Sequence, residues 1–343
     1  MAVRASIRRR GLFGGVQRLV IAVSGGPDSM ALFFALLRIG RASKSGPELV
    51  VAHLDHGLRP SSSEDARFVA QAAANAGIEA VVERIDVAAE AASRRENIEA
   101  TGRAVRYGFL ARVAAERRAE AVATGHTATD QAETVVMRLA RGTGVDGLAG
   151  IAASRELATG TRLVRPMIDS TRDDVLAYCL DREIRFLEDA TNADLQRSRA
   201  FARHELLPRL ERVSPGAAAN FARAARLAED DRKFFSLRVA ETMAAWGVAT
   251  VGRVELPVAA VAALEPALRR RVLREAVRRA RGDLVRIDMG HIEAIDGLLD
   301  EDRHGREATL PLGIRARRVG ESLIVDCDVE MQTRSSVQSD DSP

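Results

Sequence analysis

The stretch "LVIAVSGGPDSMALFFALL" (residues 19–37) decides the fold of the first half of this chain. A short apolar run ends in the hexapeptide SGGPDS, residues 24–29, and a longer apolar segment follows directly. This is the layout of a strand, a glycine-rich turn and a helix, in which backbone N–H groups at the helix N-terminus hold a phosphate. The lysine of the Walker pattern is missing, and so is the third glycine of a dinucleotide-binding fingerprint.

The composition of this loop indicates which phosphates it holds. Its two glycines let a ligand approach the backbone closely, and Pro27 fits the first turn of a helix. Asp28 would repel a phosphate unless a divalent cation bridges the two. Because no lysine is aimed at a γ-phosphate, the loop favours binding β- and γ-phosphates as a leaving pyrophosphate. An ordinary glycine-rich turn between strand and helix is the alternative interpretation.

The first half of the chain alternates short β-like runs with helical segments, which predicts an α/β fold with a doubly wound, Rossmann-like parallel sheet. Strands are predicted at residues 18–23, 49–54, 80–85, 121–124 and 162–165, and helices at residues 28–39, 64–76, 97–118 and 130–141. In such sheets, ligands bind beyond the carboxyl ends of the strands. The polar segments that follow three strands, at residues 24–29, 53–59 and 125–133, are therefore expected at one edge.

Changes in composition predict the domain organisation. We expect a basic N-terminal tail over residues 1–16 and the α/β domain over residues 17–210. A smaller helical and α+β domain is expected over residues 211–330, followed by a disordered polar tail over residues 331–343. Within the second domain, "ALRRRVLREAVRRARG" (residues 267–282) predicts an amphipathic helix whose arginines face water or RNA phosphates.

The bulk composition, 46% apolar and 29% charged, is typical of a soluble globular protein. The longest uninterrupted apolar run covers only residues 30–37, too short to span a membrane, and the N-terminus lacks the apolar segment of a secretory signal. We therefore expect a cytoplasmic protein. The net charge is +3, and almost all of the basic residues are arginines. An arginine-rich surface suits a nucleic-acid partner but is also compatible with an ordinary solvated surface.

The cysteines exclude several kinds of site. Only Cys179 and Cys327 are present, far apart and without a C-x-x-C motif. A thiolate zinc site, an iron–sulfur cluster built by this chain alone and a disulfide framework are all excluded.

Further motifs accompany the loop in a fixed order. They are "AHLDHGLRPSSSEDA" (residues 52–66), "NIEATGRAVRYGFL" (97–110), "ATGHTATDQAETVVMRLARGTGVDGLAGI" (123–151), "RPMIDSTRDDV" (165–175) and "DATNAD" with "RHELLPRL" (189–210). The loop resembles the PP-loop of the N-type ATP pyrophosphatases, which cleave ATP between its α- and β-phosphates. With these motifs, residues 18–210 resemble the tRNA(Ile)-lysidine synthetase family. "LPLGIRARRVGESLIV" (310–325) resembles the first appended domain of that family.

The resemblance implies a ligase reaction in two steps. ATP adenylates the C2 oxygen of the wobble cytidine in the CAU anticodon of tRNA(Ile), with release of pyrophosphate. The ε-amine of free L-lysine then displaces AMP and gives lysidine, with Mg²⁺ assisting. Because members of the family often form dimers, a homodimer is a further expectation.

Position and resemblance together give the candidate site residues. Residues expected to bind ATP are Ser24, Gly25, Gly26, Pro27, Asp28, Ser29, His53, Gly125 and His126. The catalytic candidates are Asp28, which would also hold Mg²⁺ with ATP, and Asp130 and Glu133, for which helix capping and a salt bridge are the alternative. Residues expected to contact tRNA or substrate are Asp55, His56, Arg59, Arg103, Arg106, Arg199 and Arg203. Helix packing or a surface position is the alternative for Arg59, Arg103 and Arg106.

Two positions depart from the family pattern. Thr129 stands where the family usually has the first of two aspartates. The role of that aspartate is therefore either dispensable in this chain or performed by Asp130. The family's R-N-R-x-R segment is replaced by Arg199-Ala-Phe-Ala-Arg203, which keeps a basic face but loses the asparagine.

Three other functions compete with this interpretation. A tRNA thiolase is disfavoured because paired cysteines are absent, and an amide-forming synthetase because no glutaminase domain fits in 343 residues. A noncatalytic tRNA- or nucleotide-binding protein would bind ATP without turnover, and Thr129 is the residue that favours it.

Overall fold

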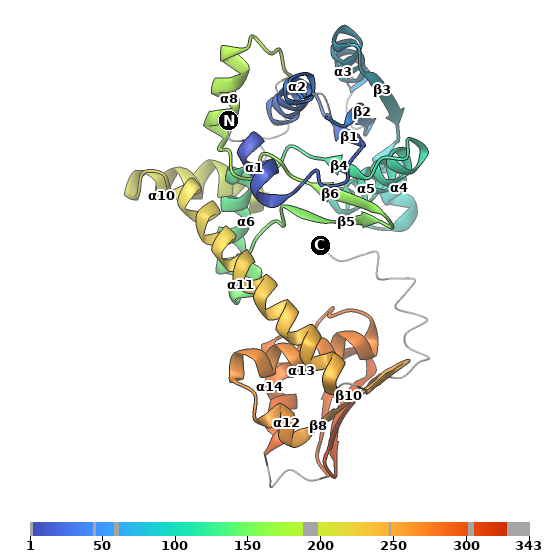
Figure 1. Cartoon of the computed structure of the whole chain (residues 1–343), viewed down its shortest axis with the longest axis vertical. Coiled ribbons are helices and arrows are strands. Elements are labelled where there is room, and N and C mark those ends of the chain that lie inside the picture. The colour runs from blue at the N-terminus through green and yellow to red at the C-terminus, as the bar shows by residue number, and fades with distance from the viewer. Residues whose placement is uncertain are drawn as a thin grey trace. The chain divides into compact units, whose positions relative to one another are not determined.

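In a computed structural model of the chain, the described residues are 3–43, 46–57, 62–187, 198–246, 248–300 and 305–327. The chain divides into two compact units, Met1–Glu229 and Asp230–Pro343 (Figure 1). The first unit extends past residue 210, where the sequence predicted a boundary. The reason is that Leu207, together with Leu210 and Phe221, packs on Ala132 and Val136 of the first unit.

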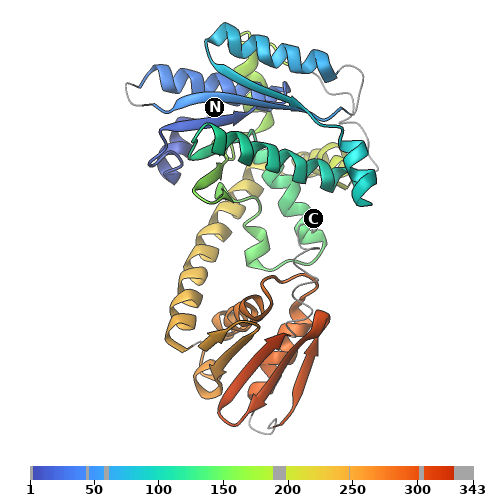
Figure 2. The same ribbon diagram turned by 90° about the vertical axis from the view of Figure 1, so that its right-hand side faces the viewer.

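The first unit is built on a mixed sheet of six strands (Figure 2). From one edge to the other these are β3 (Glu79–Arg84), β2 (Glu48–Asp55), β1 (Arg18–Ala22), β4 (Ala121–Ala123), β6 (Thr161–Val164) and β5 (Ser154–Ala158). The five predicted strands are present and pair in parallel, which confirms the α/β fold. Strand β5 was not predicted, and it pairs antiparallel with β6, so the sheet is not wholly parallel. Arg155 and Glu156 of this strand are exposed and only Leu157 packs on the core, so the strand lacks the apolar pattern of the other strands.

Helices cover both faces of this sheet. In the described part of the unit they are α1 (Val3–Arg10), α2 (Pro27–Arg41), α3 (Ser62–Ala76), α4 (Val87–Arg94), α5 (Ile98–Glu116), α6 (Ala128–Ala140), α7 (Val145–Leu148), α8 (Arg172–Asp181), α9 (Ser198–Phe201), a π-helix (Ala202–Leu206) and α10 (Leu207–Val213). Side chains alternate between the faces of a strand. Leu19 and Ile21 of β1 accordingly pack with Phe33 of α2, while Val20 packs with Leu110 of α5.

The N-terminal segment is not the tail that the sequence predicted. Val3 of α1 and Leu12 are buried in the same core as α2, being 3% and 1% exposed. Arg10 of this helix pairs with Asp169 at 3.0 Å. The abundant arginines of this segment conceal its few apolar residues in the sequence, and those residues are enough to dock the helix.

The second unit carries an antiparallel sheet of five strands. In order across the sheet these are β7 (Val248–Thr250), β8 (Arg253–Pro257), β11 (Ser322–Cys327), β10 (Ile314–Val319) and β9 (Glu307–Leu310). Its helices are α12 (Val258–Ala262), α13 (Pro266–Arg281), α14 (Met289–Asp296) and 3₁₀ turns at Gly297–Leu299 and Pro311–Gly313, and α11 (Ala217–Trp246) runs from the first unit into this one. The predicted amphipathic helix is α13, which buries Val272, Leu273, Ala276 and Val277.

The predicted tail over residues 331–343 lies outside the described residues. No helix within the described ranges is long and apolar enough to cross a membrane.

Candidate active site

The loop between β1 and α2 is held by its own serines. The Ser29 hydroxyl accepts a hydrogen bond from the Ser24 N–H at 3.1 Å and donates to the Gly26 carbonyl at 2.9 Å. Gly25 has a φ of +92°, a backbone conformation that favours glycine, and a Cβ there would also lie 2.8 Å from a methyl carbon of Leu187, which would have to move. The first N–H groups of α2 have no partner within the helix, which leaves them available to an anion.

Gly125, after β4, lies directly against this loop. A Cβ at this position would be 3.0 Å from the Asp28 carbonyl oxygen and 3.2 Å from the Ser29 nitrogen, both backbone atoms. The ends of β1 and β4 therefore meet, as the sequence predicted for segments that follow parallel strands.

We expect Gly125→Ala to lower turnover by roughly 10-fold, since the added methyl group must push the loop by a few tenths of an ångström and small displacements at reacting groups are costly. The measurement is steady-state ATP consumption, with far-UV circular dichroism to show that the fold is kept. Gly108→Ala, on α5 with open space at its Cβ, is the matched control. Wild-type turnover in Gly125→Ala would show that the loop adapts freely.

Asp28 is the charged group of the loop, and it has one satisfied and one unsatisfied oxygen. Its Oδ2 accepts a hydrogen bond from Nη1 of Arg172 at 3.0 Å. Its Oδ1 is buried, and no described residue hydrogen-bonds it. Burial raises the pKa of this carboxyl, and the nearby Arg172 guanidinium counteracts the rise only in part. Arg172 was missed by sequence reasoning, although its place beside the cap residue Thr171 put it at a helix N-terminus after β6.

Thr129 links the N-termini of α6 and α8. Its hydroxyl accepts a hydrogen bond from the backbone N–H of Arg172 at 3.1 Å. The N–H of the neighbouring Ala128 donates to the Ser170 carbonyl at 2.7 Å. The threonine that departs from the family pattern therefore satisfies an otherwise orphaned helix N–H and positions the residue that pairs with Asp28.

Glu133 and Asp130 form a network with two arginines. Glu133, which is 0% exposed, accepts hydrogen bonds from Nε of Arg199 at 2.7 Å and Nε of Arg203 at 2.5 Å. Asp130 accepts from Nη2 of the same two residues at 2.7 and 3.3 Å. The two carboxylates and two guanidinium groups balance in charge, so the arginines expected to contact tRNA are paired with the acidic candidates.

Asp130 also caps its own helix. Its Oδ2 accepts from the N–H and the hydroxyl of Thr127 at 2.8 and 2.9 Å. Burial raises the pKa of Asp130, but Arg199, the hydrogen bond from Thr127 and Arg203 outweigh it, and the pKa is lowered. Asp130 therefore stays charged at neutral pH.

The three histidines expected at the site are held neutral by burial. Nδ1 of His53 donates to the Val23 carbonyl at 2.8 Å, since a carbonyl can only accept. His126 lies 3.0 Å from the Thr124 hydroxyl, and burial, reinforced by Arg165, lowers its pKa to about 3. Burial also lowers the pKa values of His53 and His56.

These shifts predict how stability depends on pH. The folded-state pKa of His126 lies below its ordinary value of 6.5, so between the two values the unfolded chain binds more protons. The stabilising contribution of neutral His126 is complete above about pH 6.5 and declines as the pH falls toward 3. Urea unfolding at about pH 7 and about pH 5 should show a smaller loss of free energy in His126→Asn than in the wild type. Equal losses would contradict this assignment.

The remaining candidates lie around the site in different settings. Asp55 accepts the Gly57 N–H at 2.8 Å and thereby shapes the turn after β2. Arg59 lies outside the described residues. Arg103 and Arg106 flank the ring of Tyr107 on α5, with their Cζ atoms 5.2 and 5.5 Å from the ring centroid.

Neither cysteine is suited to nucleophilic chemistry. Cys179 is buried beneath the loop, 3.8 Å from the Pro27 carbonyl, and burial together with Asp28 raises its pKa to about 11. Cys327 is buried in the second unit. Among the described residues, no three His, Cys, Asp or Glu side chains gather to hold a metal ion.

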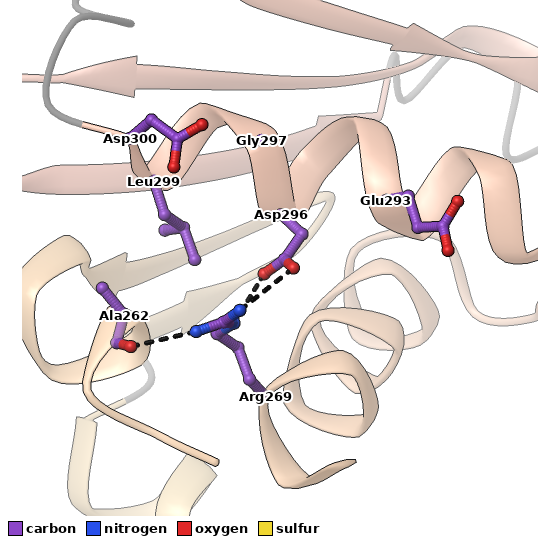
Figure 3. Close-up of a pocket in the computed structure, with 7 residues that line it drawn as sticks. All are labelled: Ala262, Arg269, Glu293, Asp296, Gly297, Leu299 and Asp300. Carbon is purple, nitrogen blue, oxygen red and sulfur yellow. Dashed lines mark hydrogen bonds and ion pairs between the residues drawn. The ribbon is translucent and has the colours of Figure 1, made fainter. Parts of the chain in front are cut away.

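A cavity of about 420 Å³ lies in the second unit (Figure 3). Figure 3 shows the guanidinium group of Arg269 between two acceptors. Its Nε and Nη2 donate to the carboxylate of Asp296 at 2.7 and 3.3 Å, and its Nη1 donates to the Ala262 carbonyl. Glu293 and Asp300 add two further carboxylates to its lining. With three acids and one arginine, this cavity does not suit a phosphate, and none of the candidate residues lines it.

The loop on this sheet defines the class of protein. Residues 6–210 match the family described as the PP-loop domain, and residues 256–323 match the TilS substrate binding domain. The chain is 41% identical to the tRNA(Ile)-lysidine synthase of Geobacter sulfurreducens over 89% of its length, and 33% identical to that of Nostoc sp. over 94%. It belongs to the tRNA(Ile)-lysidine synthase family.

The matched relatives differ in length. The chain spans 64% of the Geobacter protein, 56% of the Thermus thermophilus protein, to which it is 39% identical over 90% of its own length, and 95% of the Nostoc protein. A solved structure with a similar fold is the U34-tRNA thiolase NcsA of Methanococcus maripaludis with its [4Fe-4S] cluster. The TM-score is 0.55 at 20% identity, covering 66% of this chain and 78% of that one.

Proposed function

We propose that this chain is the ligase that adenylates the C2 oxygen of the wobble cytidine in the CAU anticodon of tRNA(Ile) and then joins free L-lysine to it. Family membership supports this reaction. The observation that carries it is the convergence of two features at one sheet edge. A loop suited to pyrophosphate carries Asp28, and a charged Asp130 lies close enough to act on the pKa of Asp28.

In the first step, the backbone N–H groups at the start of α2 would hold the β- and γ-phosphates. Arg172 would neutralise charge on the departing pyrophosphate. The unsatisfied, buried Oδ1 of Asp28 fits Mg²⁺, which usually takes one or two protein carboxylates and completes its shell with phosphates and water. When bound, Mg²⁺ would stabilise negative charge on the phosphates.

In the second step, the incoming lysine carries an ammonium group that must be attracted and deprotonated. Asp130 stays ionised at neutral pH because its pKa is lowered, and the ammonium group would meet this carboxylate by replacing a hydrogen bond from Arg199 or Arg203. His126 is neutral, so its unprotonated ring nitrogen can accept a hydrogen bond from the ammonium group, but with a pKa lowered to about 3 it is too weak a base to take the proton. Both side chains follow β4 and lie at the same edge as the loop.

The test is tRNA-dependent formation of AMP and pyrophosphate in the presence of lysine, with isoleucine and methionine CAU transcripts compared. Turnover with the isoleucine transcript alone, completed only when lysine is present, is the expected result. Consumption of ATP without dependence on lysine would indicate another PP-loop enzyme that modifies tRNA. Binding of ATP without turnover on either transcript would indicate a noncatalytic protein. Thr129 is the residue that favours this alternative, and its hydrogen bond with the backbone N–H of Arg172 gives it a structural role instead.

A further inference from the structure

Four arginines surround Tyr107 of α5. Arg155 of β5 has its Cζ 4.8 Å from the ring centroid, and Arg103 and Arg106 have theirs at 5.2 and 5.5 Å. Arg165 follows β6 and is near enough to act on the phenol. Burial raises the pKa of Tyr107, but Arg103, Arg106 and Arg165 outweigh it, and the pKa is lowered. We call these five residues the Tyr107 cluster.

Arg165 is the buried member of the Tyr107 cluster. Arg165 is only 3% exposed. Nη1 donates to the Ala152 carbonyl at 2.6 Å, but the buried Nε has no partner among the described residues. A guanidinium without a counter-charge is costly to bury, so this position calls for an anion.

The described part of the chain supplies no such anion. None of the four arginines forms an ion pair with a described carboxylate, whereas arginines elsewhere in the unit do. Arg172 pairs with Asp28, and Arg112, also on α5, pairs with Glu83 at 2.7 Å. The Tyr107 cluster is therefore a local excess of positive charge.

We propose that the Tyr107 cluster binds a phosphate group, supplied by the backbone of the RNA substrate. Guanidinium groups match phosphate oxygens through paired hydrogen bonds, and the tyrosine ring holds several of them by cation–π contacts. Arg103 and Arg155 are exposed and can be reached from solvent. This inference rests on the proposed function for the identity of the RNA.

The position in the sheet favours RNA over ATP as the source. Arg165 lies near enough to His126 to act on its pKa, but Arg155 is on β5, which β4 and β6 separate from β1 by about 14 Å at the usual strand spacing. The triphosphate of ATP is already accounted for at the start of α2. A polynucleotide carries a phosphate at every residue, and it can reach a second site while one base occupies the first.

The test is Arg155→Gln, with Arg112→Gln as a control that removes the same charge from a paired arginine. The probe is a fluorescein-labelled anticodon stem-loop RNA with a CAU anticodon, titrated by anisotropy at several KCl concentrations. Arg155→Gln should reduce the slope of log K against log [KCl] by roughly 0.7–0.9, the value of one phosphate contact. Arg112→Gln should leave the slope unchanged. Arg103→Gln is a second variant, and thermal unfolding checks the fold of each.

ATP affinity is measured in parallel for the same variants. An unchanged ATP affinity with a reduced RNA slope supports the RNA phosphate. A weakened ATP affinity with an unchanged RNA slope would assign the phosphate to the nucleotide instead, and no change in either would overturn the site. Neither measurement requires turnover, so a failure of the lysine-joining reaction would not affect its outcome.

Discussion

Asp28→Ala is expected to lower tRNA-dependent release of pyrophosphate by at least about 10²- to 10³-fold, the usual effect of removing one group that stabilises transition-state charge. The physical reason is that Asp28 is the carboxylate of the phosphate loop and the partner of Arg172 at 3.0 Å. Affinity for the stem-loop RNA should remain largely intact, because Asp28 is not part of the Tyr107 cluster. The measurement is initial-rate pyrophosphate release, with RNA anisotropy on the same preparation.

The stability of this variant separates a functional role from a structural one. Removing Asp28 relieves the cost of its buried, unsatisfied Oδ1 but also leaves Arg172 without its partner, so the melting temperature should change little. Asp173→Ala removes an exposed carboxylate from the first turn of α8, next to Arg172, and should leave turnover near wild type. If adenylation survives in Asp28→Ala, the assignment of the cation to this carboxylate is wrong.

The sequence predicts the loop and its flanking elements because their signals are contiguous. The apolar run of β1, the glycines and the proline of α2 stand within one short stretch, and each acts on its immediate neighbours. Strand β5 was missed because an exposed edge strand needs no apolar alternation. Helix α1 was missed because Val3 and Leu12 gain their partners only in the folded core.

The pairings at the site show the same limit. Asp130, Glu133, Arg199 and Arg203 were each found in motifs, but their mutual pairing joins segments about 70 residues apart and only the fold creates it. Arg172 lies 144 residues from Asp28, so no local pattern connects the two. The acidic pair was predicted as catalytic and the arginines as RNA contacts. In the fold the arginines are instead the ion-pair partners of the acids. A substitution of one acid therefore tests the stability of the fold as well as catalysis.

Glu133→Gln is accordingly the second large effect that we expect. Glu133 is 0% exposed and takes both of its ion pairs from Arg199 and Arg203. The substitution keeps the shape of the side chain but removes the charge, and it leaves the two guanidinium groups to share Asp130. Because the arginines retain some access to water, we expect the free energy of unfolding to fall by about 2–3 kcal/mol, below the full cost of breaking a buried pair. Urea unfolding measures this directly.

Glu205→Gln is the matched control. Its ion pair with Arg209 is equally short, at 2.7 Å, but both side chains are exposed, so the loss should stay below about 1 kcal/mol. A loss in Glu133→Gln no larger than in Glu205→Gln would show that the buried network does not hold α9 and the π-helix against α6. Arg199 and Arg203 would then be free for RNA, and Arg203→Gln should reduce the salt dependence of RNA binding. If the network is as strong as its geometry indicates, Arg203→Gln should instead lower stability and leave that salt dependence unchanged.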